Sequence, residues 1–342
     1  MKVFHLSHTD LDGYGAQFIT SRYFDDIVFF NSNYGREIDQ RIEQITALAQ
    51  KGDCILITDL NLSLAQCKKL DEFCKEKEVK ITLLDHHISA LECVGEYEWY
   101  FLDTQRSASA ITFDFFSSIF GDKKGLEKIT KVINSVDIWK SDEEEFELGK
   151  VLLAAVATAK EINKIMFDKE HRDYIFHILS SSMSFFNEEE AHIKLDEKLY
   201  FIKKEFFKRD KNDSFGNLIS NYIVLLLSDQ KEKFSIDYNG HRGILTYNIG
   251  NTSVIGNDFL RANRDFDFFM DINSKKGVSI RADDGLDVSV MAAKLFGGGG
   301  HKNASGGVFL QFKDGFLYEE IKKQLQDYIN LKVKEENSDE KK

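Results

Sequence analysis

The sequence contains no proline among its 342 residues. An average globular chain carries about 5% proline, so a proline-rich linker between domains is excluded. Cysteine is also scarce: Cys54, Cys67, Cys74 and Cys93 stand singly, without the paired spacing of a zinc or redox motif. We therefore expect reduced thiols in a cytoplasmic protein, with Cys67 and Cys74 packed in a helix rather than joined as a disulfide.

Excess positive charge and long apolar runs are missing as well. The formal net charge is −12 at pH 7, which argues against a long basic groove for nucleic acid. A short anionic substrate is not excluded, because bound divalent cations reverse the local field. No apolar run approaches the length of a transmembrane helix, and residues 1–8 lead directly into a predicted strand. We therefore expect neither a membrane partner nor a secretory signal peptide.

Residues 1–150 alternate between strand and helix patterns, and we predict that they form a first domain. Apolar strands that are each separated by about one helix indicate a parallel sheet with helices on both faces. The fold class is therefore α/β. The predicted strands are residues 2–6, 27–30, 54–58, 79–84 and 97–102, and the predicted helices are residues 14–24, 37–50, 64–75 and 107–120.

The rest of the chain divides into three parts. Residues 151–233 carry apolar residues at helical spacing and are predicted to be a helical connector. Residues 234–332 are predicted to be a smaller α/β domain, and residues 333–342 a charged tail. In this second domain we predict strands at 243–247, 266–272, 277–281 and 308–312, a helix at 288–296, and a hairpin connection at 273–276.

Charged and imidazole side chains follow several of the predicted strands. Ligands of parallel sheets bind beyond the carboxyl ends of the strands, so these side chains should converge at one edge. Their number exceeds the needs of one ion and suits two divalent metals about 3.5–4 Å apart. Oxygen ligands with a minority of imidazole favour Mn²⁺, with Mg²⁺ or Co²⁺ as alternatives. The residues are His8, Asp10, Asp12, Asp59, Asp85, His86, His87 and Arg106, and Asp137 closes another apolar stretch.

A run of four glycines, residues 297–300, lies in the second domain. Because glycine disfavours helix and strand alike, we expect this run to form neither. Its successive N–H groups could cradle a phosphate or the edge of a base. Arg281, at the end of a predicted strand, is a natural partner for a terminal phosphate. The proposed substrate contacts of this domain are Arg281, Gly298, Gly299, Gly300, His301, Asn303 and Ser305.

These motifs together resemble one family. His8-x-Asp10-x-Asp12-Gly13, Asp59, Asp85-His86-His87 and Asp137 are similar, in this order, to the four motifs of the DHH phosphoesterase superfamily. Residues 297–307 resemble the signature of its DHHA1 substrate domain. Many relatives place more residues between the first His and Asp than the single Thr9 found here. The resemblance implies a DHH lobe with a parallel sheet, a helical connector and a smaller DHHA1 lobe.

The resemblance also implies roles for the motif residues. One metal would be held by His8, Asp10 and Asp59, and the second by Asp12, Asp59, His86 and Asp137. Asp85 would orient an imidazole. His87 would face the scissile phosphate, as donor or acid.

The activity implied is Mn²⁺-dependent hydrolysis of short oligonucleotides or linear dinucleotides to nucleoside 5′-monophosphates, by an enzyme that can form a homodimer. Alternatives in the same superfamily are hydrolysis of cyclic nucleotides or of 3′-phosphoadenosine 5′-phosphate, and a RecJ-like single-strand exonuclease, which the acidic balance disfavours. A non-catalytic nucleotide sensor is the alternative from another class.

Simpler interpretations exist for three of these positions. Arg106 could contact phosphate or be an ordinary surface arginine. Asp12 with Gly13 could be only a helix-capping turn. Asp137 could be only the end of a helix.

Overall fold

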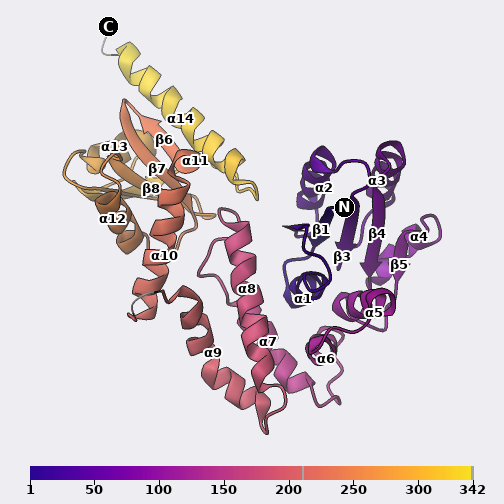
Figure 1. Ribbon diagram of the computed structural model, residues 1–342. Helices are drawn as coiled ribbons and strands as arrows, with labels where there is room; N and C mark the ends of the chain where they lie inside the picture. Colours follow the sequence, from indigo (N-terminus) through magenta and orange to yellow (C-terminus); the bar gives the residue numbers. More distant parts are fainter. Residues whose placement is uncertain (210–211, 340–342) are drawn as a thin grey trace. The chain divides into compact units, whose positions relative to one another are not determined.

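The computed structural model describes residues 1–209 and 212–339, and the chain divides into two compact units (Figure 1). The first unit consists of Met1–Ala159 and Arg172–Lys203, and the second of Lys160–His171 and Lys204–Lys342. Residues 151–233, the expected helical connector, therefore belong partly to each unit.

The first unit is built on a sheet of five strands in the order β2-β1-β3-β4-β5. Every neighbouring pair in this sheet is parallel, which confirms the predicted parallel sheet. All five strands carry apolar runs, as expected for a sheet covered on both faces. The strands are β1 (Val3–Ser7), β2 (Ile27–Asn31), β3 (Cys54–Thr58), β4 (Lys80–Asp85) and β5 (Tyr100–Leu102).

Helices cover both faces of this sheet, so the predicted α/β fold class is confirmed. On one face, α2 (Arg36–Leu48) and α3 (Leu64–Lys77) bury apolar side chains against Phe4, Ile55 and Leu83. On the other face, α5 (Ala108–Phe120) packs Ile111 against Leu56 and Leu84. Helix α1 (Leu11–Thr20) packs against α5. All four cysteines are free thiols.

Helix α1 begins three residues before the predicted start. Asp10 is its N-cap, and the carboxylate of Asp10 accepts a hydrogen bond from the Gly13 N–H. The remaining elements assigned wholly or partly to the first unit are η1 (Ile88–Ala90), α4 (Leu91–Val94), α6 (Leu126–Asp137), α7 (Phe146–Ala157), α8 (Asp168–Ser182), η2 (Met183–Phe185) and α9 (Ala191–Phe207).

The second unit is built on a mixed sheet of six strands in the order β10-β11-β9-β8-β7-β6. Only β7 and β8 pair in parallel, and β8 and β9 form the hairpin predicted around residues 273–276. Its strands are β6 (Ser235–Tyr238), β7 (His241–Tyr247), β8 (Phe268–Ile272), β9 (Gly277–Ala282), β10 (Gly299–His301) and β11 (Ala304–Val308), and its helices are α10 (Phe215–Asp229), α11 (Lys231–Phe234), α12 (Thr252–Ala262), α13 (Val288–Phe296) and α14 (Tyr318–Asp339).

Two predictions for this unit are wrong. The glycine run does form a strand, because Gly299–His301 pair antiparallel with β11 at the edge of the sheet. The close approach of the two chains requires glycine, since a Cβ on Gly298 would lie 2.0 Å from the carbonyl oxygen of Gly306. The strand predicted at residues 308–312 lies earlier, at β11, and the apolar residues Phe309 and Phe312 fill the core from a turn.

Across residues 1–209 and 212–339, every helix is too short or too polar to cross a bilayer.

Candidate metal centre

The segment between β1 and α1 places two potential ligands close together. The Nδ1 atom of His8 lies 2.8 Å from Oδ2 of Asp10. The other oxygen of Asp10 accepts the Gly13 N–H at 3.0 Å. A Cβ on Gly13 would lie 2.4 Å from the carbonyl oxygen of His8, so only glycine allows the helix to start this close to the loop.

Asp12 lies in the first turn of α1 and is held by the N-terminus of α5. Its carboxylate accepts hydrogen bonds from the N–H groups of Ala108 at 2.6 Å and Ser109 at 2.8 Å. A helix N-terminus favours an anion, which accounts for a carboxylate that is only 1% exposed. Asp12 therefore does more than shape a capping turn, because it fixes α1 to α5.

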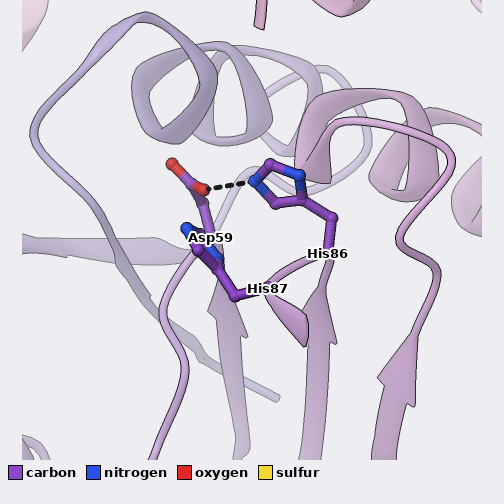
Figure 2. A group of neighbouring side chains, drawn as sticks. All are labelled: Asp59, His86 and His87. Atoms are coloured by element: carbon purple, nitrogen blue, oxygen red, sulfur yellow. Dashed lines mark hydrogen bonds and ion pairs between the residues drawn. The ribbon is translucent and has the colours of Figure 1, made fainter. Parts of the chain in front are cut away.

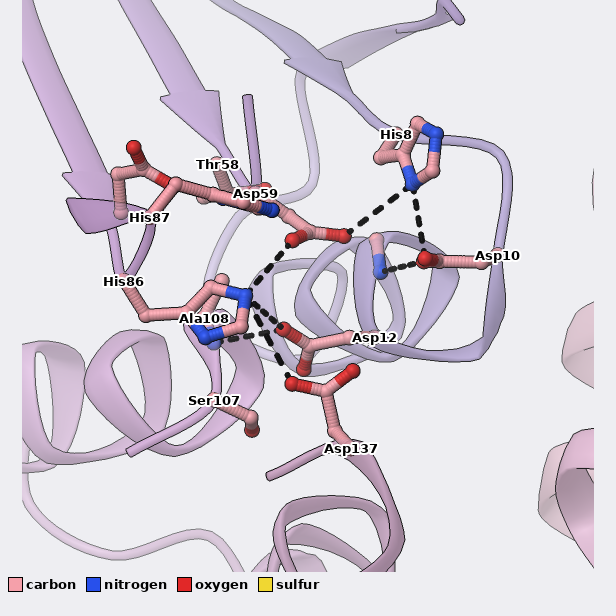
Figure 3. Close-up of polar contacts among 12 residues, drawn as sticks. His8, Asp10, Asp12, Thr58, Asp59, His86, His87, Ser107, Ala108 and Asp137 are labelled. Atoms are coloured by element: carbon pink, nitrogen blue, oxygen red, sulfur yellow. Dashed lines mark hydrogen bonds and ion pairs between the residues drawn. The ribbon is translucent and has the colours of Figure 1, made fainter. Parts of the chain in front are cut away.

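Asp59 and His86 form the middle of the site. Asp59 follows β3 in the left-handed region, with φ of 56°, a conformation found in non-glycine residues mainly where the surroundings impose it. Oδ1 of Asp59 lies 3.3 Å from Nε2 of His86. Figure 2 marks this contact with a dashed line. The same nitrogen lies 3.6 Å from Oδ2 of Asp137 and 3.9 Å from Oδ2 of Asp12 (Figure 3).

Asp137 is the last residue of α6, as the helix-terminus interpretation expects, and this position leaves its carboxylate available as a ligand. Asn134, one turn earlier, accepts the Ser107 N–H at 2.9 Å. This bond ties the end of α6 to the start of α5, where Asp12 is also held. The carboxylate of Asp137 is thereby directed toward His86.

Among the described residues, the potential ligand atoms gather into three groups. His8, Asp10 and Asp59 form the first, Asp12, His86 and Asp137 the second, and Asp59, His86 and His87 the third. The ligand atoms within each group lie within 4.8 Å of one another. Asp59 faces the first two groups, because its Oδ2 lies 3.8 Å from His8 Nδ1 and its Oδ1 contacts His86.

The electrostatics of the group fit bound cations. Burial and the charges of Asp12, Asp10 and Asp137 raise the pKa of Asp59 well above its usual value. Burial and the charges of Asp12 and Asp10 raise the pKa of Asp137 to about 9. The Oδ2 atoms of Asp59 and Asp137 are buried without a hydrogen-bond partner. Crowded carboxylates with unsatisfied oxygens are costly unless cations neutralise them, so the donor set suits divalent metals.

Asp10 differs from its neighbours. Burial raises the pKa of Asp10, but the hydrogen bond and charge of His8 and the Gly13 N–H outweigh this effect and lower the pKa to about 2. Asp10 is therefore ionised at neutral pH, as a metal ligand must be.

Asp85 and His87 form a second pair behind the ligands. Asp85 is fully buried at the end of β4, and its Oδ1 lies 2.7 Å from Nδ1 of His87. Its other oxygen accepts the hydroxyl of Tyr100 at 3.0 Å. The imidazole that Asp85 orients is thus that of His87, and this hydrogen bond raises the pKa of His87.

Tyr34 is a site residue that the motif analysis does not include. Its hydroxyl lies 3.0 Å from Nε2 of His87, and its ring centroid lies 5.1 Å from that of His8. The residue follows β2, whose carboxyl end lies at the same edge of the sheet as those of β1 and β3. Applied to the second strand as well, the strand-end rule would have included it.

Arg106 is paired with carboxylates. Its Nε donates to Asp103 at 2.7 Å, and its Nη1 donates to Asp114. A phosphate would have to compete with both acids for this guanidinium. Arg106 borders a pocket of about 620 Å³ whose other lining residues are mostly apolar: Leu84, Leu91, Phe101, Leu102, Ile111 and Phe115, with Asp103, Thr104 and Asp114.

The expected substrate residues of the second unit lie on the adjacent strands β9, β11 and β10 or directly beside them. Arg281 on β9 is in register with Ala304 on β11, which pairs in turn with β10. The guanidinium of Arg281 donates to Ser253 Oγ at 2.8 Å. Asn303 donates to Asp284 at 2.8 Å, and Ser305 donates to the carbonyl of His301, also at 2.8 Å. Gly299, Gly300 and His301 are exposed along the edge strand.

Comparisons with known proteins give a full-length relative. The chain is 39% identical, over 345 residues, to a 3′,5′-cyclic-nucleotide phosphodiesterase of Helicobacter pylori, covering 96% of this chain and 99% of that one. A crystal structure of an uncharacterized protein from Helicobacter pylori G27 aligns with a TM-score of 0.88 and 38% identity, over 96% of this chain and 99% of that one.

Other comparisons are weaker. No family model matches the chain. RecJ from Thermus thermophilus in complex with Mn²⁺ aligns over 96% of this chain and 52% of its own, at 13% identity and a TM-score of 0.32, too low to support an inference. The full-length identity to the Helicobacter pylori protein is decisive by itself, and the chain belongs to the family of that phosphodiesterase.

Proposed function

We propose that this chain is a metal-dependent phosphodiesterase of the DHH–DHHA1 type that hydrolyses 3′,5′-cyclic nucleotides to nucleoside 5′-monophosphates. The observation that carries the chemistry is the pair of ligand groups that face Asp59, one around His8 and one around His86. The full-length relative supports the choice of a cyclic nucleotide over the other substrates of the superfamily.

Each ligand group would hold one divalent ion. His8, Asp10 and Asp59 would bind the first, and Asp12, Asp59, His86 and Asp137 the second. Oxygen ligands with one imidazole each favour Mn²⁺, with Mg²⁺ or Co²⁺ as alternatives. When bound, two such ions supply an activated water and neutralise charge on a phosphoryl group.

The protein itself supplies rigid positioning. Asp12 is held by two amides of α5, so its carboxylate keeps its place whatever the occupancy of the site. His87 is oriented by the buried Asp85, and we assign it to hydrogen-bond a phosphoryl oxygen or to protonate the leaving oxygen.

A linear dinucleotide or short oligonucleotide is the second candidate substrate. It is favoured by the exposed edge strand β10, whose backbone groups could contact a second phosphate or base. Arg281, two strands away in the same sheet, would supply the positive charge. A cyclic mononucleotide has no second phosphate to place there.

A substrate panel tests the proposal. Protein stripped with EDTA and reloaded with Mn²⁺, Mg²⁺ or Co²⁺ is assayed with 3′,5′-cyclic AMP and GMP, a 5′-phosphorylated dinucleotide, 3′-phosphoadenosine 5′-phosphate and a long single strand. We expect metal-dependent release of nucleoside 5′-monophosphate from the cyclic nucleotides. Preference for the dinucleotide would select the second candidate, and rapid digestion of the long strand would select an exonuclease. Binding without turnover of any substrate would indicate a nucleotide sensor.

Two histidine variants test the division of roles. His86→Ala should purify with less metal, and excess Mn²⁺ should partly restore its activity. His87→Ala should keep near-normal metal content while kcat falls by roughly 10²–10⁴, the range for a lost acid or oxyanion donor. His192→Ala, at a histidine outside the cluster, is the control. Equal metal loss in the His86 and His87 variants would contradict the assignment.

A further inference from the structure

The hydroxyl of Tyr34 contacts the ring nitrogen of His87 that does not contact Asp85. Nδ1 of His87 lies 2.7 Å from Asp85, and Nε2 lies 3.0 Å from the hydroxyl of Tyr34. A carboxylate oxygen accepts hydrogen bonds, so in this contact Nδ1 is the donor and Asp85 the acceptor. A tyrosine hydroxyl can donate or accept, and it can therefore hold Nε2 in either protonation state of the ring.

Hydrogen bonds on two sides hold the segment that carries Tyr34 in place. The buried carboxylate of Glu37 accepts both the backbone N–H and the side-chain amide of Asn33, each at 2.9 Å. The oxygen of that amide accepts the hydroxyl of Thr9 at 2.7 Å. The N–H of Ser32 donates to the carbonyl of Ser7 at 2.9 Å. These bonds fix the segment both to α2 and to the loop that carries the expected metal ligands between β1 and α1.

Ring contacts complete the arrangement. The centroid of the Tyr34 ring lies 5.9 Å from that of His87, in an edge-on orientation, and 5.1 Å from that of His8. Tyr34 thus lies between a ligand of one metal group and the imidazole assigned to the phosphate. The side chain stays 45% exposed, so it borders the open side of the site.

We infer that Tyr34 is a positioning residue for His87: before substrate binds, its hydroxyl holds Nε2 and so sets the orientation of the ring, and it gives up that nitrogen to the phosphoryl group when substrate arrives. The inference rests on the proposed function, in which His87 acts on that group. Nothing in the contacts of Tyr34 assigns it to a metal, because its hydroxyl contacts His87 and its ring only packs against His8.

Tyr34→Phe removes the hydroxyl and keeps the ring. With the Mn²⁺-loaded enzyme we expect kcat to fall about 3- to 10-fold, the value of one hydrogen bond, while KM changes less than about 2-fold. The rise in Tm on adding Mn²⁺ should be unchanged. Tyr23→Phe is the matched control, because that hydroxyl donates to the carbonyl of Gly121, away from the metal ligands.

A double-variant cycle separates action through His87 from action on the substrate. In the His87→Ala background, Tyr34→Phe should cost nothing further. If the two single effects multiply in the double variant, or if Tyr34→Phe raises KM at unchanged kcat, Tyr34 acts on the substrate itself and the inference is overturned.

A measurement without turnover keeps the inference separate from the proposed function. In ¹⁵N-histidine spectra of the Mg²⁺-loaded protein, Tyr34→Phe should shift the Nε2 resonance of His87, assigned by its loss in His87→Ala, and Tyr23→Phe should not. An unmoved resonance refutes the positioning role even in an active enzyme. A shifted resonance in a protein that hydrolyses no phosphodiester upholds the contact and rejects the proposed function instead.

Discussion

Asp137→Asn should stabilise the metal-free protein at neutral pH and weaken its response to Mn²⁺. The raised pKa of Asp137, about 9, means that the folded chain holds a proton on this carboxyl at pH 7. The unfolded chain has released it, since an unperturbed aspartate titrates near 3.9. Below pH 4 the carboxyl of Asp137 is protonated in both states and costs no stability. Its contribution to the free energy of unfolding is then lost progressively as the pH rises toward 9. Asparagine keeps the shape of the side chain and never has to hold that proton.

The size of the effect follows from this pKa. Each unit of difference is worth about 1.4 kcal/mol, so titration from pH 4 to pH 7 sets a ceiling of roughly 4 kcal/mol. The side chain of Asp137 is 20% exposed, and solvent screening lowers that ceiling. We expect a gain of roughly 1–4 kcal/mol at pH 7, which corresponds to a Tm increase of roughly 3–12 °C in a unit of this size.

Thermal unfolding followed by circular dichroism in EDTA and in Mn²⁺, at pH 4, 5.5 and 7, measures both parts of this prediction. In EDTA the advantage of the variant should grow from almost nothing at pH 4 to its full value at pH 7. With Mn²⁺ the wild type should gain more Tm than the variant, because a ligand is missing. Asp142→Asn, an exposed aspartate outside the cluster, should change neither quantity. A variant less stable than wild type in EDTA at pH 7, or an equal gain from Mn²⁺, would refute the reasoning.

Three further predictions address other parts of the molecule. Asp59→Ala removes the carboxylate that faces both ligand groups and should lower kcat at least ~10³-fold; more than a tenth of wild-type activity at saturating Mn²⁺ would contradict the dimetal assignment. Burial and the nearby Arg172 lower the pKa of His5 to about 3, so its neutral form contributes stability above pH 6.5 that is lost on acidification. Urea titrations should therefore show that the destabilisation caused by His5→Gln shrinks by about 2 kcal/mol between pH 6.5 and 5. A destabilisation that does not change with pH would exclude this cause. Arg281→Ala should lower kcat/KM for a 5′-phosphorylated dinucleotide about 10- to 150-fold while leaving bis-p-nitrophenyl phosphate unaffected; equal losses with both substrates would place Arg281 in the chemistry.

Local sequence pattern was enough to predict where these strands of the first unit lie. The apolar segments predicted β3 at its observed bounds and placed β1, β2 and β4 within a residue or two of them. Parallel strands end at one edge, so residues after those strands had to converge there once the strands were placed. His8, Asp10, Asp59 and His86 were predicted as neighbours by this reasoning, and the structure brings them together.

The second unit followed local pattern less closely. Residues 308–312 are mostly apolar, as in a buried strand, yet the pairing is made by the glycine-containing β11. A Cβ on Gly306 would lie 2.5 Å from the carbonyl oxygen of Val278, so the absence of side chains is what lets these chains approach. Propensity penalises glycine in a strand, and only the packing of neighbouring chains outweighs that penalty.

Sequence pattern was sufficient to predict that the candidate metal ligands meet at the carboxyl edge of a parallel sheet. The partner of each of these side chains depends on the tertiary structure. Asp12 is held by α5, 96 residues further along the chain, His87 by Tyr34, 53 residues earlier, and Arg106 by two carboxylates beside it. The physical reason is the distance along the chain. Periodicity indicates on which face of its own helix or strand a residue lies. A hydrogen bond to a distant element also depends on where that second element ends, and no local pattern records that position.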